Sequence, residues 1–239
     1  MNEKYNPRIV FKLAVITLFI GLIVNLPTLR AQEISQITDL PLQLSVSRGS
    51  LDVLAVYITG DGGWNNFNQQ IVQLLVKQGY GVVALNSRKY FWNEKSPEIF
   101  AHDAEHLAQY YMKEWNKTSV IFVGYSFGAD VTSFLPNRVS AELRQKIKKI
   151  ALISPSASSD FVIRLSDLVS ESENVNRKYK VGPEIDQIIL PVVCTFGNDE
   201  DKVLKNTLII SKNITINKLP GDHRYNYDFP LLLKTIGIY

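Results

Sequence analysis

Ser126 lies in a pentapeptide whose residue types suit a nucleophile. The stretch Gly124-Tyr-Ser-Phe-Gly128 fits the pattern G-x-S-x-G, in which the serine occupies a sharp turn between a strand and a helix. Side chains two residues either side of the serine would collide in such a turn, and glycine removes that obstacle. The apolar run Val120 to Val123 indicates the preceding strand, and Ala129 to Leu135 is compatible with the following helix. The pattern predicts an exposed, nucleophilic Ser126.

A nucleophilic serine needs a general base, and His223 is the histidine best placed to supply it. It lies in Pro220-Gly-Asp-His-Arg-Tyr225, after an expected strand near the C-terminus. In the α/β-hydrolase fold the chain order is serine, acid, histidine. His102 and His106 precede the serine, within an expected helix. Such an i, i+4 pair could bind a metal, but no third ligand is evident nearby, so we interpret both as surface residues and expect no metal site and no cofactor.

The acid partner is expected in the loop Gly197-Asn-Asp-Glu-Asp201. Spacing from the strand end favours Glu200, with Asp199 and Asp201 as alternatives. The carboxylate would bind the far nitrogen of His223, fix its tautomer and stabilise the imidazolium. The same residues could instead form a solvated turn at a helix start, where carboxylates favour the helix dipole.

An oxyanion hole would be formed by backbone amides at two turns. The Phe127 amide lies at the start of the helix after the serine, and a second donor is expected from Asp61 or Gly62 in Gly60-Asp-Gly-Gly63. The Asp61 carboxylate should turn away and tie down its loop, because in the hole it would repel the developing anion. A nucleotide-phosphate loop is disfavoured, since the G-x-G-x-x-G spacing and a following lysine are missing.

Short apolar runs alternate with longer amphipathic ones along the chain, which predicts an α/β fold with a mostly parallel sheet and helices on both faces. The serine-rich stretch 155–186 is expected to be a small cap inserted into a hydrolase domain over 40–239, because about thirty residues cannot build an independent core. The expected strands are Leu42–Val46, Val53–Thr59, Tyr80–Leu85, Val120–Val123, Ile150–Ser154, Val192–Phe196 and Ile214–Leu219, and the expected helices begin near Phe67, Pro97, Phe127 and Phe229.

The first 31 residues have the pattern of an export signal. Basic residues precede an apolar run, Leu13 to Leu26, and Leu29-Arg-Ala31 is an acceptable cleavage site. The run is short for a spanning helix, so an uncleaved inner-membrane anchor is the alternative. The rest of the chain carries 22 basic and 22 acidic side chains, which gives no support to a nucleic-acid partner. Cys194, the single cysteine, is expected to be a buried strand residue.

Four motifs together resemble the bacterial virulence-protein family of VirJ and the C-terminal half of AcvB. They are Gly60-Asp-Gly-Gly-Trp64, Ser87-Arg-Lys-Tyr-Phe-Trp92, Gly124-Tyr-Ser-Phe-Gly-Ala-Asp-Val131 and Pro220-Gly-Asp-His223. The resemblance implies a periplasmic α/β-hydrolase domain with Ser126 as the nucleophile. The family usually has Gly-Gly-His-His where this chain has Gly-Asp-His-Arg, so Arg224 replaces a second histidine.

The resemblance also implies a substrate. Members similar to AcvB hydrolyse aminoacylated phosphatidylglycerol, in particular the lysyl ester, whereas the VirJ branch is linked to export of virulence factors. The chain is therefore expected to be a periplasmic serine esterase acting on a phospholipid or small ester at the membrane surface. A non-catalytic module that holds export substrates or secretion-system proteins is the alternative.

Aromatic side chains near the site could receive a cationic aminoacyl group. Tyr90, Phe91 and Trp92 follow an expected strand and so lie at the carboxyl edge of the sheet. They could form a substrate wall, or they could pack beneath the cap. Arg88 could bind a lipid phosphate or be structural. The oligomeric state leaves no recognisable mark in the sequence.

Overall fold

Strands rich in β-branched residues form the centre of the fold. Every residue of β3 (Gly81–Leu85) and β4 (Ser119–Tyr125) is buried, as is nearly all of β2 (Val53–Ile58). Such continuous apolar strands are stable where helices cover both faces of a sheet. This agrees with the predicted α/β class.

The computed structural model describes residues 37, 39–46, 51–164, 173 and 175–238. The chain divides into two units, Met1–Leu40 and Pro41–Tyr239, and the fold is that of the second. The expected signal, 1–31, lies outside the described residues. In the described part of the chain, no helix has the length and hydrophobicity needed to cross a membrane.

Seven strands of the described residues form one sheet, in the order β1-β3-β2-β4-β5-β8-β9. The edge strand β1 (Leu42–Ser45) is antiparallel to β3, and the other neighbours are parallel. The remaining strands of the sheet are β5 (Ile147–Ile153), β8 (Val192–Gly197) and β9 (Ile214–Leu219).

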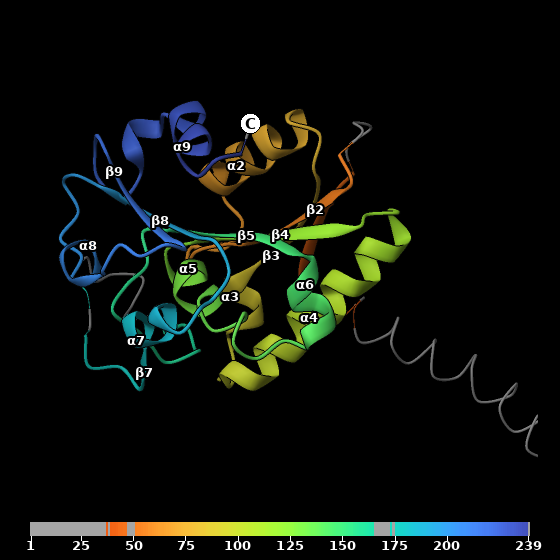
Figure 1. The fold of residues 1–239 in the computed structure, drawn as a ribbon, viewed down its shortest axis with the longest axis horizontal. Coiled ribbons are helices and arrows are strands. Elements are labelled where there is room, and N and C mark those ends of the chain that lie inside the picture. Colours follow the sequence, from red (N-terminus) through yellow and green to blue (C-terminus); the bar gives the residue numbers. More distant parts are fainter. Residues whose placement is uncertain (1–36, 38, 47–50, 165–172, 174, 239) are drawn as a thin grey trace, which may run out of the picture. The chain divides into compact units, whose positions relative to one another are not determined.

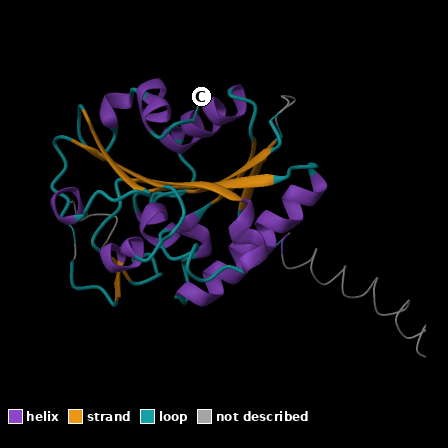
Figure 2. Cartoon of the chain, viewed as in Figure 1, coloured by secondary structure: helices purple, strands orange, loops and turns teal. Residues whose placement is uncertain are grey.

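Helices form a layer on each face of the sheet (Figures 1 and 2). On one face, α2 (Asn66–Lys77) and α9 (Phe229–Thr235) bury apolar side chains of β2, β3 and β4 in a common core. On the other lie α4 (Pro97–Glu114), α5 (Phe127–Thr132) and α6 (Ala141–Lys146). The sheet is thus sandwiched, and its strand ends are left for loops.

Capping residues set the ends of α2 and α4, the two longest helices in the part of the chain that the structure describes. The Asn65 side chain accepts a hydrogen bond from the Asn68 amide at the start of α2, and Gly79, with φ of 95°, follows its end. The Ser96 side chain caps α4, whose first residue is Pro97. These local signals explain why both helices lie where the sequence predicts them.

The expected strands are all present within one to three residues, and several shorter elements were not predicted. These are α3 (Ser87–Tyr90), α6, β6 (Ser158–Ser159), β7 (Tyr179–Lys180), α7 (Val181–Asp186), α8 (Leu204–Thr207) and the 3-10 turn η1 (Tyr225–Tyr227). Elements of two to six residues are too short to show a hydrophobic period.

Described residues of the predicted cap region, 155–186, pack beside α3 and α4. Its described part contains the small antiparallel pair β6–β7 and helix α7. The Lys95 amide donates to the Phe161 carbonyl at 3.0 Å, and the Ile163 amide donates to the Phe91 carbonyl at 2.9 Å. Residues 165–172 and 174 lie outside the described residues.

Candidate active site

Ser126 occupies a strained turn between β4 and α5. Its φ is 55°, a left-handed conformation uncommon for serine, and its amide donates to the Ile153 carbonyl at 2.8 Å. A Cβ on Gly124 would lie 2.4 Å from the Gly128 carbonyl oxygen, and one on Gly128 would lie 2.2 Å from that of Ile58. Both glycines are needed because backbone occupies the space where a side chain would project. The half-buried Ser126 is therefore held at the tip of the turn.

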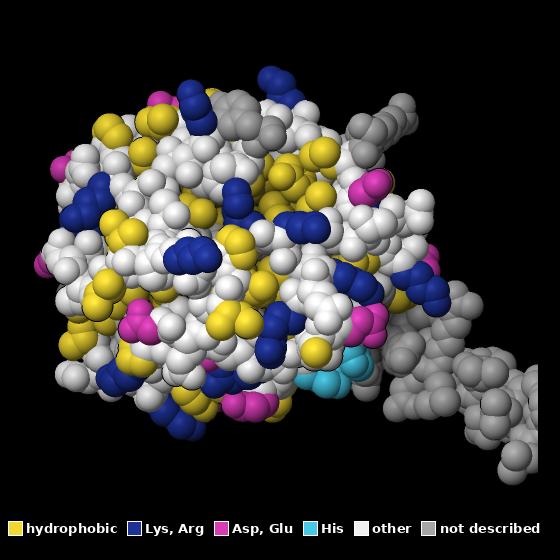
Figure 3. Space-filling model, viewed as in Figure 1, with side chains coloured by type: hydrophobic (Ala, Val, Ile, Leu, Met, Phe, Trp, Pro, Cys, Tyr) yellow, Lys and Arg dark blue, Asp and Glu magenta, His cyan; other side chains and the backbone are white. Residues whose placement is uncertain are grey.

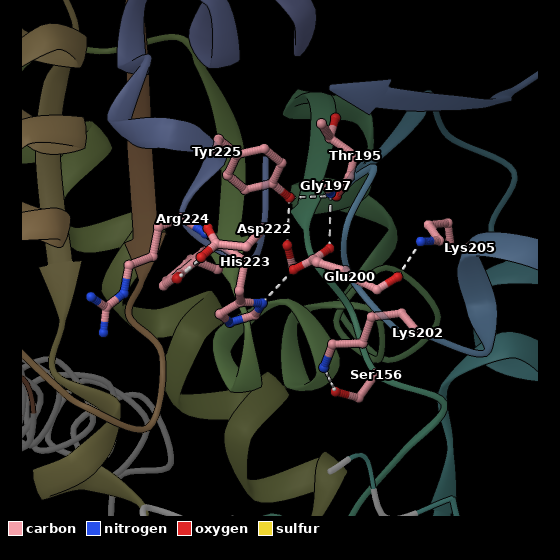
Figure 4. A network of polar contacts seen from close by, with 12 residues as sticks. Ser156, Thr195, Gly197, Glu200, Lys202, Lys205, Asp222, His223, Arg224 and Tyr225 are labelled. Atoms are coloured by element: carbon pink, nitrogen blue, oxygen red, sulfur yellow. Dashed lines mark hydrogen bonds and ion pairs between the residues drawn. The ribbon is translucent and has the colours of Figure 1, made fainter. Parts of the chain in front are cut away.

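Glu200 and His223 meet at the carboxyl ends of β8 and β9 (Figure 4). The His223 Nδ1 atom lies 2.5 Å from Glu200 Oε1, and the second carboxylate oxygen accepts from the Gly197 amide at 2.9 Å. The Glu200 side chain is buried, whereas Asp199 and Asp201 are exposed. Of the three acidic residues that the sequence offered, the structure brings Glu200 to the histidine.

The environment of Glu200 favours its ionised form. Burial acts to raise its pKa, but hydrogen bonds from His223, Ser154 and the Gly197 amide outweigh burial and lower the pKa overall. The carboxylate is therefore charged at neutral pH. A charged acceptor at Nδ1 keeps the proton on that nitrogen and leaves the Nε2 lone pair free to accept a proton.

Tyr125 connects the turn of Ser126 to the loop of His223. Its hydroxyl donates to the His223 carbonyl at 3.1 Å, and the two rings lie 5.1 Å apart. On its other side the Tyr125 ring stacks on Phe67 of α2 at 4.4 Å. The residue directly before the serine thus supports the histidine loop, a contact that the sequence pattern did not predict.

The histidine loop is also fixed by unusual backbone conformations. Tyr225, Asn226 and Tyr227 have φ values of 55°, 50° and 60°. The Tyr225 hydroxyl is buried, donates to the Thr195 carbonyl at 2.9 Å and contacts the Ser154 hydroxyl. Each residue in a left-handed conformation costs free energy, and a series of them persists only where the surrounding structure holds the backbone in place. The anchored tyrosine supplies that restraint two residues after His223.

Two backbone amides beside Ser126 have no acceptor among the described residues. They belong to Phe127, the first residue of α5, and Asp61. The Gly62 amide differs, because it donates to the Asp61 carboxylate at 2.8 Å. That carboxylate ties its own loop, as expected from its sequence. A Cβ on Gly60 would lie 3.3 Å from Ser126 Cβ, so this loop passes beside the serine.

The four residues expected at a substrate wall divide into two groups. Tyr90 and Phe91 are buried; Phe91 packs on Phe127 at 5.1 Å, and the Tyr90 hydroxyl donates to Asp103 at 2.5 Å. Of the two interpretations given above, packing beneath the cap region is the one that fits Tyr90 and Phe91. Trp92, which is 54% exposed, and Arg88 face solvent.

The structure leaves one expected contact open. Among the described residues, no hydrogen bond joins the Ser126 hydroxyl to His223. Catalytic hydrogen bonds are often long before substrate binds. The serine turn, the histidine loop and the acid loop are nevertheless linked through Tyr125 and the Glu200–His223 pair.

Other residues singled out in the sequence lie apart from this arrangement. The rings of His102 and His106 lie 4.1 Å apart on α4, and the described residues contain no group of three His, Cys, Asp or Glu side chains placed to hold a metal ion. Cys194 is fully buried, and burial raises the pKa of its thiol to about 12. On the face drawn in Figure 3, basic side chains are dispersed among apolar and acidic ones.

The fold and the order of these residues along the chain are those of the α/β-hydrolase class. Solved structures with this fold include Est1E from Butyrivibrio proteoclasticus with bound ferulic acid (15% identity, TM-score 0.57, covering 82% of this chain and 92% of that chain). Others are a lipase-esterase related protein from Clostridium acetobutylicum (11%, 0.58, 82% and 99%) and MenH from S. aureus (12%, 0.57, 81% and 97%). No curated protein matches the sequence. The family model of the bacterial virulence protein VirJ matches residues 52–237, and the chain belongs to that family.

Proposed function

We propose that the chain is a serine esterase in which Ser126 is the nucleophile, His223 the general base and Glu200 the acid. The observation that carries the proposal is the buried, ionised Glu200 bound to His223 Nδ1. Tyr125 in turn ties the loop of His223 to the serine turn. A carboxylate buried at this cost is expected where an imidazolium must be stabilised.

The reaction would proceed through an acyl-enzyme. As the Ser126 oxygen bonds to the ester carbonyl, His223 Nε2 takes the hydroxyl proton, and the Phe127 and Asp61 amides donate to the oxyanion. The carbon–oxygen bond to the leaving alcohol then breaks, and the alcohol takes the proton from His223. Water, deprotonated by the same nitrogen, then attacks the acyl-serine. The bond between the acyl carbon and the Ser126 oxygen breaks, that oxygen takes the proton back from His223, and the acid is released. Glu200 stays ionised throughout.

The proposed substrate is the aminoacyl ester of aminoacyl-phosphatidylglycerol, of which the lysyl ester is the leading case. Membership of the VirJ family supports this choice through the resemblance to AcvB. The exposed Trp92 and Arg88 fit it chemically, since an indole face attracts an ammonium group and a guanidinium attracts a phosphate. We propose a periplasmic location, reached through the export signal at 1–31 and close to the membrane surface.

A second candidate is a non-catalytic module that supports export of virulence factors, as in the VirJ branch. The same fold could hold a secretion-system protein through the region 155–186. Under this hypothesis Ser126 is dispensable and changes in that region are not.

The deciding experiment compares amino acid release from lysyl-phosphatidylglycerol vesicles by the wild type and Ser126→Ala. The esterase account expects release to fall by at least about 10³-fold, with the thermal midpoint unchanged. Ser211→Ala, an exposed serine far along the chain, is the matched control. If Ser126→Ala is folded and keeps its turnover, or supports virulence-factor export as well as wild type does, the esterase proposal is wrong.

A further inference from the structure

A second carboxylate lies one helical turn beyond the serine and is buried. Asp130 is the fourth residue of α5 and is 4% exposed. Its Oδ1 atom accepts from the Ser156 amide at 2.5 Å. Ser156 lies in the loop that follows β5, so the contact fixes the nucleophile's helix to the next strand connection.

The same serine binds the acid loop. The Lys202 ammonium donates to the Ser156 hydroxyl at 2.7 Å, and Lys202 lies two residues after Glu200 (Figure 4). Glu173 adds a parallel link, because its carboxylate accepts from the Ala157 amide and, at 2.9 Å, from the Val203 amide. We call Asp130, Ser156, Glu173 and Lys202 the anchor cluster.

The two halves of the acid loop have different anchors. Its first half pairs with the histidine side of the site: the Asn198 amide donates to Leu219 and the Asp199 amide to Gly221. Its second half, Lys202 and Val203, is held by the anchor cluster. The cluster therefore links the loop of Glu200 to α5, the helix that follows Ser126.

Asp130 is an expensive residue to bury if its role is only to pack. Burial raises the pKa of Asp130 to about 7, and the nearby charge of Glu173 also raises it. Lys202, Arg177 and the Ser156 amide act in the opposite direction but do not outweigh burial. For a carboxyl group with a raised pKa, the folded state is favoured while the group is protonated, and this stabilisation is lost as pH rises through 7. Ionisation of Asp130 therefore reduces the stability of the folded state, and this cost points to a role of Asp130 in the geometry of the site.

Resting on the proposed esterase function, we infer that Asp130 is a positioning residue that holds the loop of Glu200 in register with Ser126, through Ser156 and Lys202. The negative charge of Asp130 keeps the Lys202 ammonium over Ser156. When that charge is removed, the second half of the acid loop loses its anchor, and Glu200 and His223 drift from the nucleophile. Small displacements of this kind lower the rate without abolishing the fold.

The test uses three single variants and two measurements on the full chain. Asp130→Asn keeps the shape and the acceptor for Ser156 but removes the charge, and Lys202→Met removes its partner. Thr132→Val is the matched control, since Thr132 is buried on the same helix and its hydroxyl has no partner in the described part of the chain. The measurements are the rate of labelling by a fluorophosphonate probe across pH and hydrogen exchange of residues 198–203.

We expect Asp130→Asn and Lys202→Met each to slow labelling at pH 8 by about tenfold or more, and the double variant to be no slower than the worse single. Exchange of 198–203 should accelerate in both. As pH falls below 7, Asp130 becomes protonated and the wild type should lose its advantage, so that the ratio of the wild-type labelling rate to that of Asp130→Asn falls from about tenfold or more at pH 8 toward one. Thr132→Val should match wild type in all three.

The inference is overturned if Asp130→Asn is labelled at the wild-type rate at pH 8, if the ratio of the two labelling rates does not change with pH, or if exchange of 198–203 is unchanged in both variants. A wild-type protein that the probe does not label would refute the esterase proposal instead. In that case the exchange measurement still decides whether the anchor cluster holds the acid loop.

Discussion

The serine turn and the acid–histidine pair are built in different ways. The turn is made by backbone: a Cβ on Gly124 or Gly128 would collide with a carbonyl oxygen, so few other residues could take their places. The pair is made by side chains that lie 23 residues apart, and it depends on hydrogen bonds from the Gly197 amide and Tyr125. A turn that depends on backbone packing is rigid and is specified by a few neighbouring residues. A pair held by several side-chain hydrogen bonds can be weakened by removing those bonds one at a time.

The largest effect is expected from filling the serine turn. Gly128→Ala should prevent the native turn, because the new methyl would lie 2.2 Å from the Ile58 carbonyl oxygen, and should lower the free energy of unfolding by more than about 2 kcal/mol. Denaturant titration measures this. Gly182→Ala is the comparison, since its nearest neighbour is a leucine methyl at 3.1 Å. Equal stability of the two variants would contradict a backbone-built turn.

Packing under the cap region should change stability by a comparable amount without preventing the native turn. Phe91→Ala removes a fully buried ring and is expected to cost about 3–5 kcal/mol. Trp92→Ala, its exposed neighbour, should change stability by less than about 0.5 kcal/mol and act on KM for the lipid ester instead. A Trp92→Ala variant with unchanged KM would remove Trp92 from the substrate wall.

The acid–histidine pair should fail in chemistry rather than in folding. Glu200→Gln should reduce kcat by about 10²–10⁴-fold, because the amide cannot stabilise the imidazolium. Asp201→Asn, in the same loop but exposed, should stay within about twofold of wild type. Ester turnover at saturating substrate separates the two. Similar losses in both variants would mean that the acid has been assigned to the wrong carboxylate.

The same glutamate should leave a mark on stability at low pH. Because its pKa is lowered in the folded chain, the stabilisation due to its charge is present above the usual value of 4.5 and is lost as pH falls through the folded pKa. The difference in unfolding free energy between wild type and Glu200→Gln should therefore shrink below pH 4.5. Urea titrations at a series of pH values measure it, and a constant difference would speak against a charged Glu200.

The smallest effect is expected at the contact between the two regions. Tyr125→Phe keeps the ring stacked on Phe67 but removes the hydrogen bond to the His223 carbonyl, which should cost about 1 kcal/mol of stability and about tenfold or less in kcat. Tyr57→Phe, another buried tyrosine that bonds Asn68, controls for loss of a hydroxyl. A Tyr125→Phe variant with lower stability but unchanged kcat would mean that this hydrogen bond does not couple the serine turn to the acid–histidine pair.

The same difference between the serine turn and the acid–histidine pair determines which features could be predicted from the sequence. The serine turn and the main strands were predictable because Gly124-Tyr-Ser-Phe-Gly128 and the β-branched runs encode them locally. For the acid, spacing favoured Glu200 but left Asp199 and Asp201 as alternatives, since burial and partner choice depend on how β8 and β9 meet. For the same reason the role of Asp130 could not be predicted: a carboxylate in the first turn of a helix is ordinary, and Lys202, which it reaches through Ser156, is 72 residues away.

The central claim, that Ser126 is activated by the Glu200–His223 pair, is tested most directly by mapping the adduct of a fluorophosphonate probe by mass spectrometry. We expect one modified residue, Ser126, in the wild type, and at least about 10³-fold slower modification in His223→Gln, with His106→Gln unaffected. An unmodified Ser126 in folded wild-type protein, or modification that is indifferent to His223, would contradict the account.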